Sequence, residues 1–142
     1  MVTLQQLLNS KGHQIHSIGP EAPVLEAVRE MALRHIGALL VMEGAELSGI
    51  VSERDYARKV VLLGRSSADT PVRDIMTAPV ITIGPDASVE DAMRTMTERR
   101  IRHLPVLHAG RVTGVVSIGD LVKCMIDDQR HLIEDLQHYI RS

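Results

Sequence analysis

The second half of the chain repeats the first half at a constant offset of 65 residues, without a gap. The match begins where residues 18–20 align with residues 83–85, and it ends where residues 49–55 align with residues 114–120. A match of this length indicates an internal duplication, in which one supersecondary unit is used twice. The chain is therefore predicted to fold as two similar halves.

Hydrophobic periodicity predicts the same elements in both halves. The first half contains a short strand, a one-sided helix, two strands joined by a tight loop, and a second helix, over about residues 15–18, 24–36, 38–42, 47–51 and 54–63. Each half is too small to bury its own sheet well, so the two should pack together. The predicted fold class is α/β, with two β-α-β-β-α repeats packed about a pseudo-two-fold axis.

Two further helices are predicted outside the repeats. A short N-terminal helix spans about residues 3–11, and an extended C-terminal helix runs to about residue 140. The C-terminal helix has one apolar side, which needs a partner surface on its own domain or on a second subunit. The predicted boundaries are a first repeat with its lead-in helix, a linker with a short helix, and a second repeat with the C-terminal helix, at residues 1–64, 65–79 and 80–142.

Composition excludes several classes of protein. The chain has no Phe or Trp and only two Tyr, and its net charge is −2, so it lacks the stacking side chains and the basic face of a nucleic-acid binder. Its single cysteine, Cys124, cannot form an intrachain disulfide, which fits a reducing compartment. The start of the chain lacks the pattern of a signal peptide, and no apolar run approaches the roughly 18 residues of a membrane span. A cytoplasmic protein without membrane association is expected.

Each half closes on the pattern Gly-x-x-Ser-x-x-Asp, at Gly49–Asp55 and at Gly114–Asp120. A Ser hydroxyl can bind a phosphate or a backbone group, and an Asp three residues later can accept from two neighbouring hydroxyls, as a ribose phosphate requires. The same pattern is also typical of a helix N-cap with an acidic first turn. Both interpretations can hold together, because a helix N-terminus favours anions.

Motifs for catalysis and for metal binding are missing from the sequence. It contains no nucleophile elbow, no Walker loop, no Rossmann fingerprint and no metal motif. His131 and His138 are seven residues apart, but no set of carboxylates accompanies them. The sequence predicts that the protein is not an enzyme and that it holds no metal.

With these features the sequence closely resembles a tandem CBS-domain pair, also called a Bateman module. The resemblance rests on residues 80–89, on residues 99–106 and on both Gly-x-x-Ser-x-x-Asp endings, and it covers about residues 15–125. More narrowly, the sequence is similar to small stand-alone bacterial CBS-pair proteins. The resemblance implies paired clefts that bind an adenine nucleotide, with AMP the first candidate and ADP, ATP, NAD(H) and S-adenosylmethionine as others.

The resemblance also implies which residues share a cleft, because in this family the Ser-x-x-Asp of one repeat meets the strands of the other. The first expected cleft combines Ser52 and Asp55 with Ile81, Thr82, Ile83, Arg102 and His103. The second expected cleft combines Ser117 and Asp120 with His16, Ser17, Ile18, Gly37 and Ala38.

The two expected clefts differ in charge. In the first, Asp55 would accept from the ribose hydroxyls while Arg102 and His103 face phosphate. In the second, Gly37 and Ala38 stand at the equivalent positions and carry no charge. The first cleft is therefore expected to bind the phosphorylated ligand more tightly. Arg54 either reaches a phosphate beside Asp55 or forms an exposed ion pair.

Two functions follow as hypotheses. The first is a non-catalytic regulatory module, a homodimer that senses an adenine nucleotide and acts on an unidentified partner protein. The alternative is a constitutive dimeric scaffold with vestigial clefts, in which the C-terminal helix carries assembly. A ligand that binds the folded state raises its stability, so titration with adenosine compounds separates the two hypotheses.

Overall fold

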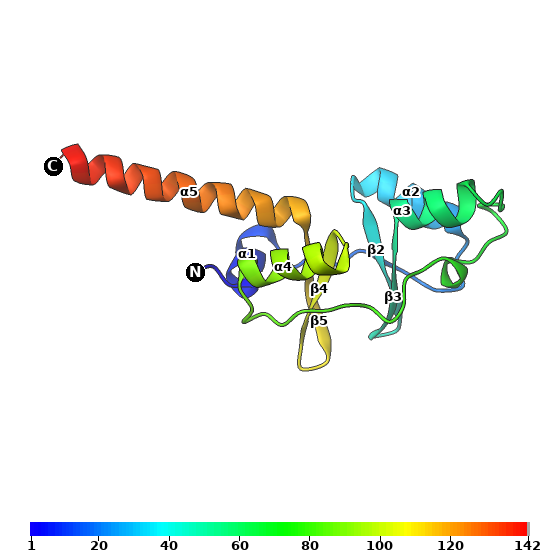
Figure 1. Cartoon of the computed structure of the whole chain (residues 1–142). Helices are drawn as coiled ribbons and strands as arrows, with labels where there is room; N and C mark the ends of the chain where they lie inside the picture. The colour runs from blue at the N-terminus through cyan, green and yellow to red at the C-terminus, as the bar shows by residue number, and fades with distance from the viewer. Residues whose placement is uncertain (142) are drawn as a thin grey trace. The chain divides into compact units, whose positions relative to one another are not determined.

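The structure is a computed structural model that describes residues 1–141. The predicted α/β class, the short N-terminal helix and the long C-terminal helix are confirmed (Figure 1). Within residues 1–141 no helix is both long and apolar enough to cross a membrane. The elements are α1 (Leu4–Lys11), β1 (Ser17–Ile18), α2 (Val24–Arg34), β2 (Ala38–Glu43), β3 (Glu46–Ser52), α3 (Glu53–Tyr56), η1 (Ala57–Val61), η2 (Val72–Asp74), α4 (Val89–Arg99), β4 (His103–His108), β5 (Arg111–Ser117) and α5 (Ile118–Arg141).

The chain forms two compact units that do not follow the order of the sequence. One unit is the continuous stretch Ile15–Ile81, which holds the first repeat and the segment after it. The other unit combines Met1–Gln14 with the chain from Thr82 on. Helix α1 therefore precedes the first repeat in sequence but packs with the second repeat.

The two repeats build the same hairpin. Strand β2 pairs antiparallel with β3, and β4 pairs antiparallel with β5. Both pairings shift register at the same point, between Val41 and Met42 and between Val106 and Leu107. Burial also alternates identically along the equivalent strands. The duplication seen in the sequence is thus a duplication of local structure.

The opening strand of each repeat is shorter than the sequence predicts. Strand β1 has two residues and pairs parallel with β2. In the second repeat the expected strand reduces to one parallel bridge, between Ile83 and Val106. A proline follows two residues after each opening, at Pro20 and at Pro85. Proline cannot donate to a strand ladder, which accounts for the early end of the pairing.

The helices begin at side-chain caps where the sequence provides them. Capping boxes open α1, α3 and α4, formed by Thr3 with Gln6, by Ser52 with Asp55 and by Ser88 with Asp91. The helix predicted over residues 54–63 is only partly α-helical, because η1 is a turn of π-helix. Its widened turn is closed by the Leu62 amide, which donates to the Ala57 carbonyl.

Each unit has its own hydrophobic core, built from the hairpin, the helix that precedes the hairpin, and a lead-in segment. The lead-in segments are the stretches that precede each repeat in the sequence, residues 1–14 and residues 65–81. In the unit Ile15–Ile81 the core consists of Val24, Ala27, Met31, Leu39, Val41, Val51, Val60, Val72 and Ile75. In the other unit six equivalent positions of the second repeat are buried, together with Leu4 and Leu8 of α1: Val89, Ala92, Met96, Leu104, Val106 and Val116. These helices therefore bury the apolar faces that the periodicity predicts.

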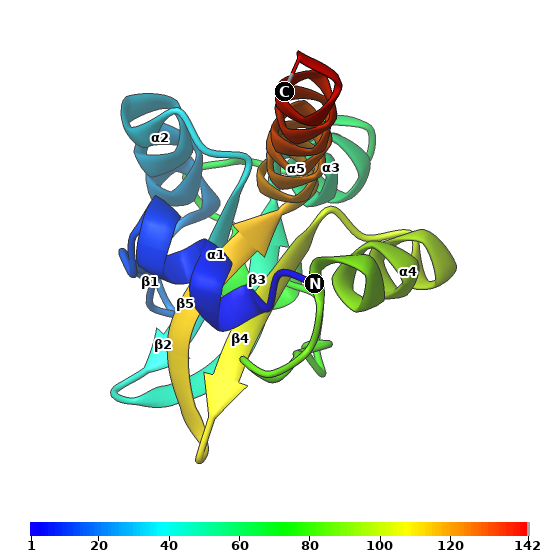
Figure 2. The ribbon, with the colours of Figure 1, turned by 90° about the vertical axis from the view of Figure 1, so that its left-hand side faces the viewer.

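Two glycines allow a lead-in segment to lie directly on a hairpin. A Cβ at Gly114 would lie 2.7 Å from Cδ2 of Leu8, and a Cβ at Gly49 would lie 2.6 Å from Sδ of Met76. The backbone of Thr77 also bridges to Ile50 on the same strand as Gly49. The segment before the second repeat thus packs on the first repeat. Helix α1 packs on β5 of the second repeat (Figure 2).

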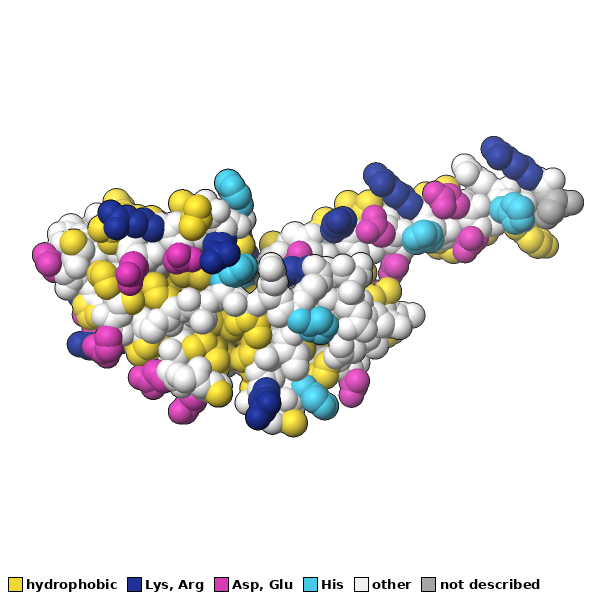
Figure 3. Space-filling model, turned by 180° about the vertical axis from the view of Figure 1, so that it is seen from behind, with side chains coloured by type: hydrophobic (Ala, Val, Ile, Leu, Met, Phe, Trp, Pro, Cys, Tyr) yellow, Lys and Arg dark blue, Asp and Glu magenta, His cyan; other side chains and the backbone are white. Residues whose placement is uncertain are grey.

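Helix α5 is long and mostly solvent-exposed. Among its described residues only Leu121 is buried. Its exposed apolar side chains include Val122, Ile126, Ile133, Leu136 and Ile140. Hydrophobic side chains show between charged ones along the helix (Figure 3). This confirms that the helix is amphipathic beyond the repeat.

Candidate ligand-binding site

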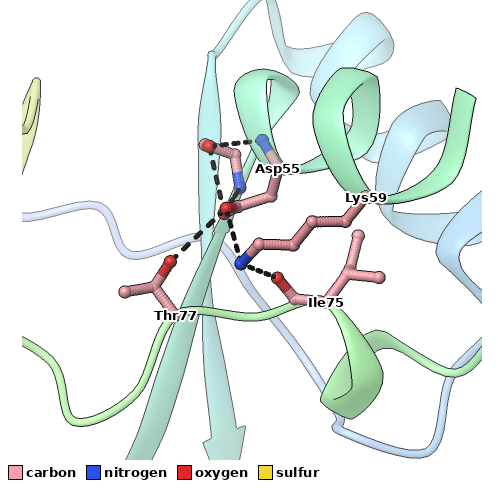
Figure 4. A network of polar contacts seen from close by, with 5 residues as sticks. Asp55, Lys59, Ile75 and Thr77 are labelled. Carbon is pink, nitrogen blue, oxygen red and sulfur yellow. Dashed lines mark hydrogen bonds and ion pairs between the residues drawn. The ribbon is translucent and has the colours of Figure 1, made fainter. Parts of the chain in front are cut away.

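Asp55 lies at the start of α3, where strand β3 ends, in a network of polar contacts (Figure 4). The Ser52 amide and the Ser52 hydroxyl donate to its Oδ2 at 3.0 and 3.1 Å, and the Ser52 Oγ accepts from the Asp55 amide at 3.1 Å. The sequence indicated either a helix cap or a ligand-binding carboxylate at this position. The cap is formed, and the carboxylate remains available to a ligand only through its other oxygen.

The second oxygen of Asp55 also has partners. Thr77 Oγ1 donates to Oδ1 at 3.4 Å, and Lys59 Nζ lies 3.2 Å from the same oxygen. Lys59 also donates to the Ile75 carbonyl at 2.9 Å. The Asp55 side chain is 13% exposed and that of Lys59 is 41% exposed, so the lysine is the more accessible group. A ligand hydroxyl can replace Lys59 here without disturbing the cap.

Asp120 is held by a similar cap at the start of α5, but its lysine partner comes from a different part of the chain. The Ser117 amide donates to its Oδ2 at 2.8 Å, and the Asp120 amide donates to the Ser117 hydroxyl at 3.1 Å. Lys11, from the end of α1, contacts the same Oδ2 at 2.6 Å and donates to the Val115 carbonyl at 2.6 Å. This lysine places a positive charge where the sequence indicated none.

The surroundings of Asp120 set its protonation. Burial acts to raise the pKa of this carboxyl, but the hydrogen bonds from Lys11 and Ser117 outweigh burial and lower the pKa below its ordinary value. Asp120 is therefore a carboxylate at neutral pH. A carboxylate is an acceptor only, as a ligand with ribose hydroxyls requires.

His103 lies beside this carboxylate within the same unit, because it pairs in register with Ser117. Burial lowers the pKa of His103, and the positive charge of Lys11 lowers it further. The imidazole is therefore neutral at neutral pH, with one nitrogen as donor and the other as acceptor. The predicted role of His103 as a partner of phosphate depends on this donor rather than on a positive charge.

In each unit, the residues just before the hairpin lie beside the Ser of the same repeat. Ala38 pairs in register with Ser52. The Gly37 carbonyl accepts from the Glu53 amide at 3.0 Å, and the Arg102 carbonyl accepts from the Ile118 amide at 2.9 Å. Both repeats therefore hold these predicted site residues by the same backbone contacts.

The predicted site residues divide between the two units. The unit Ile15–Ile81 holds His16, Ser17, Ile18, Gly37, Ala38, Ser52, Arg54, Asp55 and Ile81. The other unit holds Thr82, Ile83, Arg102, His103, Ser117 and Asp120. Each expected cleft draws on both units, so the grouping of these residues into two clefts stays a prediction.

Three residues that contact the two carboxylates were not found from the sequence. Lys59 had a signal, since it follows Asp55 by four residues and faces it along a helix. Thr77 and Lys11 lie in the lead-in segments, which the repeat match did not reach. Extended to those segments, the offset of 65 aligns Lys11 with Met76, so the charge at Lys11 has no counterpart in the other repeat.

A metal site is a separate question from a nucleotide site. Across residues 1–141 the structure brings together no group of three or more His, Cys, Asp or Glu side chains that could hold a metal ion.

Comparison with known proteins identifies the family. The family model for the CBS domain matches residues 11–62 and 72–127. A mitochondrial CBS domain-containing protein of Arabidopsis thaliana, CBSX3, is 38% identical over 149 residues, which cover 99% of this chain and 72% of that protein. A solved putative signal-transduction protein with CBS domains from Burkholderia ambifaria is 49% identical, with a TM-score of 0.87 over 90% of this chain and 96% of that chain.

A more distant solved structure shares the fold. The CBS domain pair of protein MJ0100, solved in complex with 5-methylthioadenosine and S-adenosyl-L-methionine, is 22% identical with a TM-score of 0.80, over 90% of this chain and 98% of that chain. The two matched segments, the duplicated hairpins and the high coverage agree. The chain belongs to the CBS-domain family and carries two CBS domains in tandem.

Proposed function

We propose that this protein is a non-catalytic regulatory module that binds an adenosine-containing nucleotide. AMP is the first candidate, with ADP, ATP, NAD(H) and S-adenosylmethionine as the others. One observation carries the proposal. Both repeats present a capped, half-buried Asp carboxylate at a helix start, beside a Ser whose backbone amide orients it. Such a carboxylate accepts from the two hydroxyls of a ribose.

The proposed roles follow the polar groups. Asp55 and Asp120 accept from ribose hydroxyls, and Ser52 and Ser117 hold each carboxylate in place. The basic residues Arg102, His103 and Arg54 are proposed to face phosphate. Thr82 is proposed to help Ser52 hold the nucleotide, and the remaining cleft residues are proposed to line the two clefts: Ile81, Ile83, His16, Ser17 and Ile18. The adenosine compounds bound by the distant relative MJ0100 support this class of ligand.

The discriminating experiment is a titration of the purified protein with AMP, ADP, ATP, NAD, NADH and S-adenosylmethionine, followed by calorimetry and by thermal unfolding. A ligand that binds only the folded state raises the free energy of unfolding by about 2.7 kcal/mol at one hundred times its Kd. At least one compound should bind and raise the melting temperature. If none does so at millimolar concentration, the scaffold is the better proposal.

The protein is further proposed to act as a homodimer, with α5 in the contact. Apolar residues recur on α5 at the spacing of a helix-pairing stripe, at Val122, Ile126, Ile133, Leu136 and Ile140. Lys123 and Arg130 border one side of the stripe, and Met125, Leu132 and Tyr139 border the other, so the apolar surface continues on that side. In a two-fold pair of helices the same stripe on each copy covers the stripe of its partner. This self-complementary apolar face favours a second copy as the occupant.

The dimer also serves the alternative function. A scaffold needs α5 and does not need the carboxylates, whereas a sensor needs both. A ligand can regulate a partner protein only if it binds one arrangement of the module more tightly than another. Ligand binding with a change in assembly would support the sensor, and assembly alone would support the scaffold.

A further inference from the structure

We infer that Lys11 is an internal competitor for Asp120, so that helix α1 controls access of a ligand to the second Ser-x-x-Asp site. The inference deepens the proposed function and rests on it for the nature of the ligand. Its structural basis is independent of any ligand. Nζ of Lys11 lies 2.6 Å from Oδ2 of Asp120, and both residues belong to the same compact unit.

The position of Lys11 is fixed by the whole of α1. The helix opens with a capping box between Thr3 and Gln6. The amides of Leu4 and Gln5 donate to the carbonyls of Ala87 and Pro85, both at 2.9 Å. These backbone bonds tie the start of the helix to the loop that precedes α4.

The end of α1 is tied down by different contacts. Leu8 is fully buried, and its side chain fills the space that Gly114 leaves open on β5. One turn later, Nδ1 of His13 lies 2.8 Å from the Thr113 carbonyl oxygen. Lys11 lies between these anchors, so its ammonium group reaches Asp120 only while α1 is docked on β5.

The ammonium group is satisfied where it lies. It donates to Asp120 and to the Val115 carbonyl of β5. The bond to Val115 keeps the ammonium group next to β5 when the contact with Asp120 is lost. Each carboxylate oxygen has two lone pairs that can accept hydrogen bonds. At Asp120 both lone pairs of Oδ2 are used, by Lys11 and by the Ser117 amide. A ligand whose two hydroxyls span both carboxylate oxygens must therefore displace Lys11 from Oδ2.

The lysine at Asp55 differs from the lysine at Asp120 in the part of the chain from which it comes. Its lysine, Lys59, comes from the same helical segment, four residues along the chain, and lies 3.2 Å away. The repeat offset aligns Lys59 with Cys124 and aligns Lys11 with Met76, so neither lysine has a counterpart. Lys59 can leave Asp55 by a local side-chain rotation. Lys11 is held by α1, so ligand binding at Asp120 and docking of α1 should oppose each other.

The test replaces Lys11 by the residue at the equivalent position of the other lead-in segment. Lys11→Met keeps the aliphatic stem and removes the charge, while Arg111→Met removes an exposed charge at the far end of β5 in the same unit as the matched control. The carboxyl carbon of Asp120 is followed by NMR through an acid titration. We expect a higher Asp120 pKa in Lys11→Met and no change in Arg111→Met. An unchanged pKa in Lys11→Met overturns the inference.

A second measurement isolates binding at Asp120. In an Asp55→Ala background, AMP and S-adenosylmethionine are titrated into proteins with and without Lys11→Met. Removal of a partly exposed competitor should tighten binding by about fivefold. Unchanged or weaker binding overturns competition, and weaker binding would make Lys11 a ligand-binding group instead.

Failure of the proposed function looks different. In that case neither protein binds an adenosine compound, although Lys11→Met still raises the Asp120 pKa. Control of the Asp120 carboxylate by Lys11 would then stand, and the adenosine ligand would not.

Discussion

Thr77 donates a hydrogen bond from Oγ1 to Oδ1 of Asp55, so the segment that precedes the second repeat reaches the carboxylate of the α3 cap in the first. Lys11 contacts Asp120 from the segment that precedes the first repeat, at Oδ2 instead of Oδ1. Each carboxylate therefore contacts a lead-in segment, and each contact requires that segment to be docked on the hairpin. The two contacts differ in kind, because Thr77 donates a long hydrogen bond from an uncharged hydroxyl whereas Lys11 forms a short ion pair.

Ser52→Ala should separate capping from binding. The Ser52 hydroxyl caps α3 and also donates to Asp55, so its loss should cost about 1 kcal/mol of stability and weaken the proposed ligand. Ser88→Ala is the matched control, because Ser88 caps α4 through the same kind of box with Asp91. Urea unfolding and calorimetry with AMP should show similar destabilisation for both variants and weaker binding for Ser52→Ala alone. Equal binding by both would remove Ser52 from the site.

Gly114→Ala should dislodge α1. The added Cβ would meet the Leu8 side chain at 2.7 Å, which is closer than real Cβ atoms approach. We expect a loss of about 1–3 kcal/mol in urea unfolding. The combined variant Gly114→Ala with Leu8→Ala should be less destabilised than the sum of the single variants, because the smaller side chain relieves the clash. Additive losses would show that Leu8 does not pack on this glycine.

Much of this architecture could be predicted from the sequence, and what could not has physical reasons. The offset of 65 that aligns Ser52 with Ser117 also aligns the hairpins, and hydrophobic periodicity placed α2 and α4. Lys11 could not be paired with Asp120 in this way, since they are 109 residues apart and no repeat position links them.

Hydrophobic periodicity also could not predict the local hydrogen bonding of the backbone. The π-helical turn η1 has only five residues, too few for the apolar pattern around Val60 to distinguish it from an α-helical turn. The apolar residues around Ile83 predict a strand. They do not determine how many backbone groups there form hydrogen bonds with β4, and only one bridge is formed. Polar contacts between distant segments and backbone pairing were therefore the weakest parts of the prediction.

Asp120 should make stability depend on pH in the acid range. Its pKa lies below the ordinary value of 3.8 in the folded protein, so the unfolded chain binds more protons between the two values. The contribution of Asp120 is therefore present above about pH 4 and is lost as the pH falls through the folded pKa. Urea unfolding between about pH 3 and about pH 7 should give a flatter profile for Asp120→Asn. The same flattening, to a smaller extent, is expected for Lys11→Met. A steeper profile in either variant would contradict the charge balance at this carboxylate.

Ile133→Asp should disrupt the proposed dimer without unfolding either unit. Ile133 lies in the middle of the α5 stripe and is 54% exposed in the single chain, so a charge there costs little in the monomer. In a helix pair the same charge would be buried without a partner, which is strongly unfavourable. His131→Asp places the same new charge on the opposite side of α5 and is the matched control. Analytical ultracentrifugation should show a dimer for the wild type and for His131→Asp, and a monomer for Ile133→Asp. A dimer that persists in Ile133→Asp with unchanged stability would place the contact elsewhere on the protein.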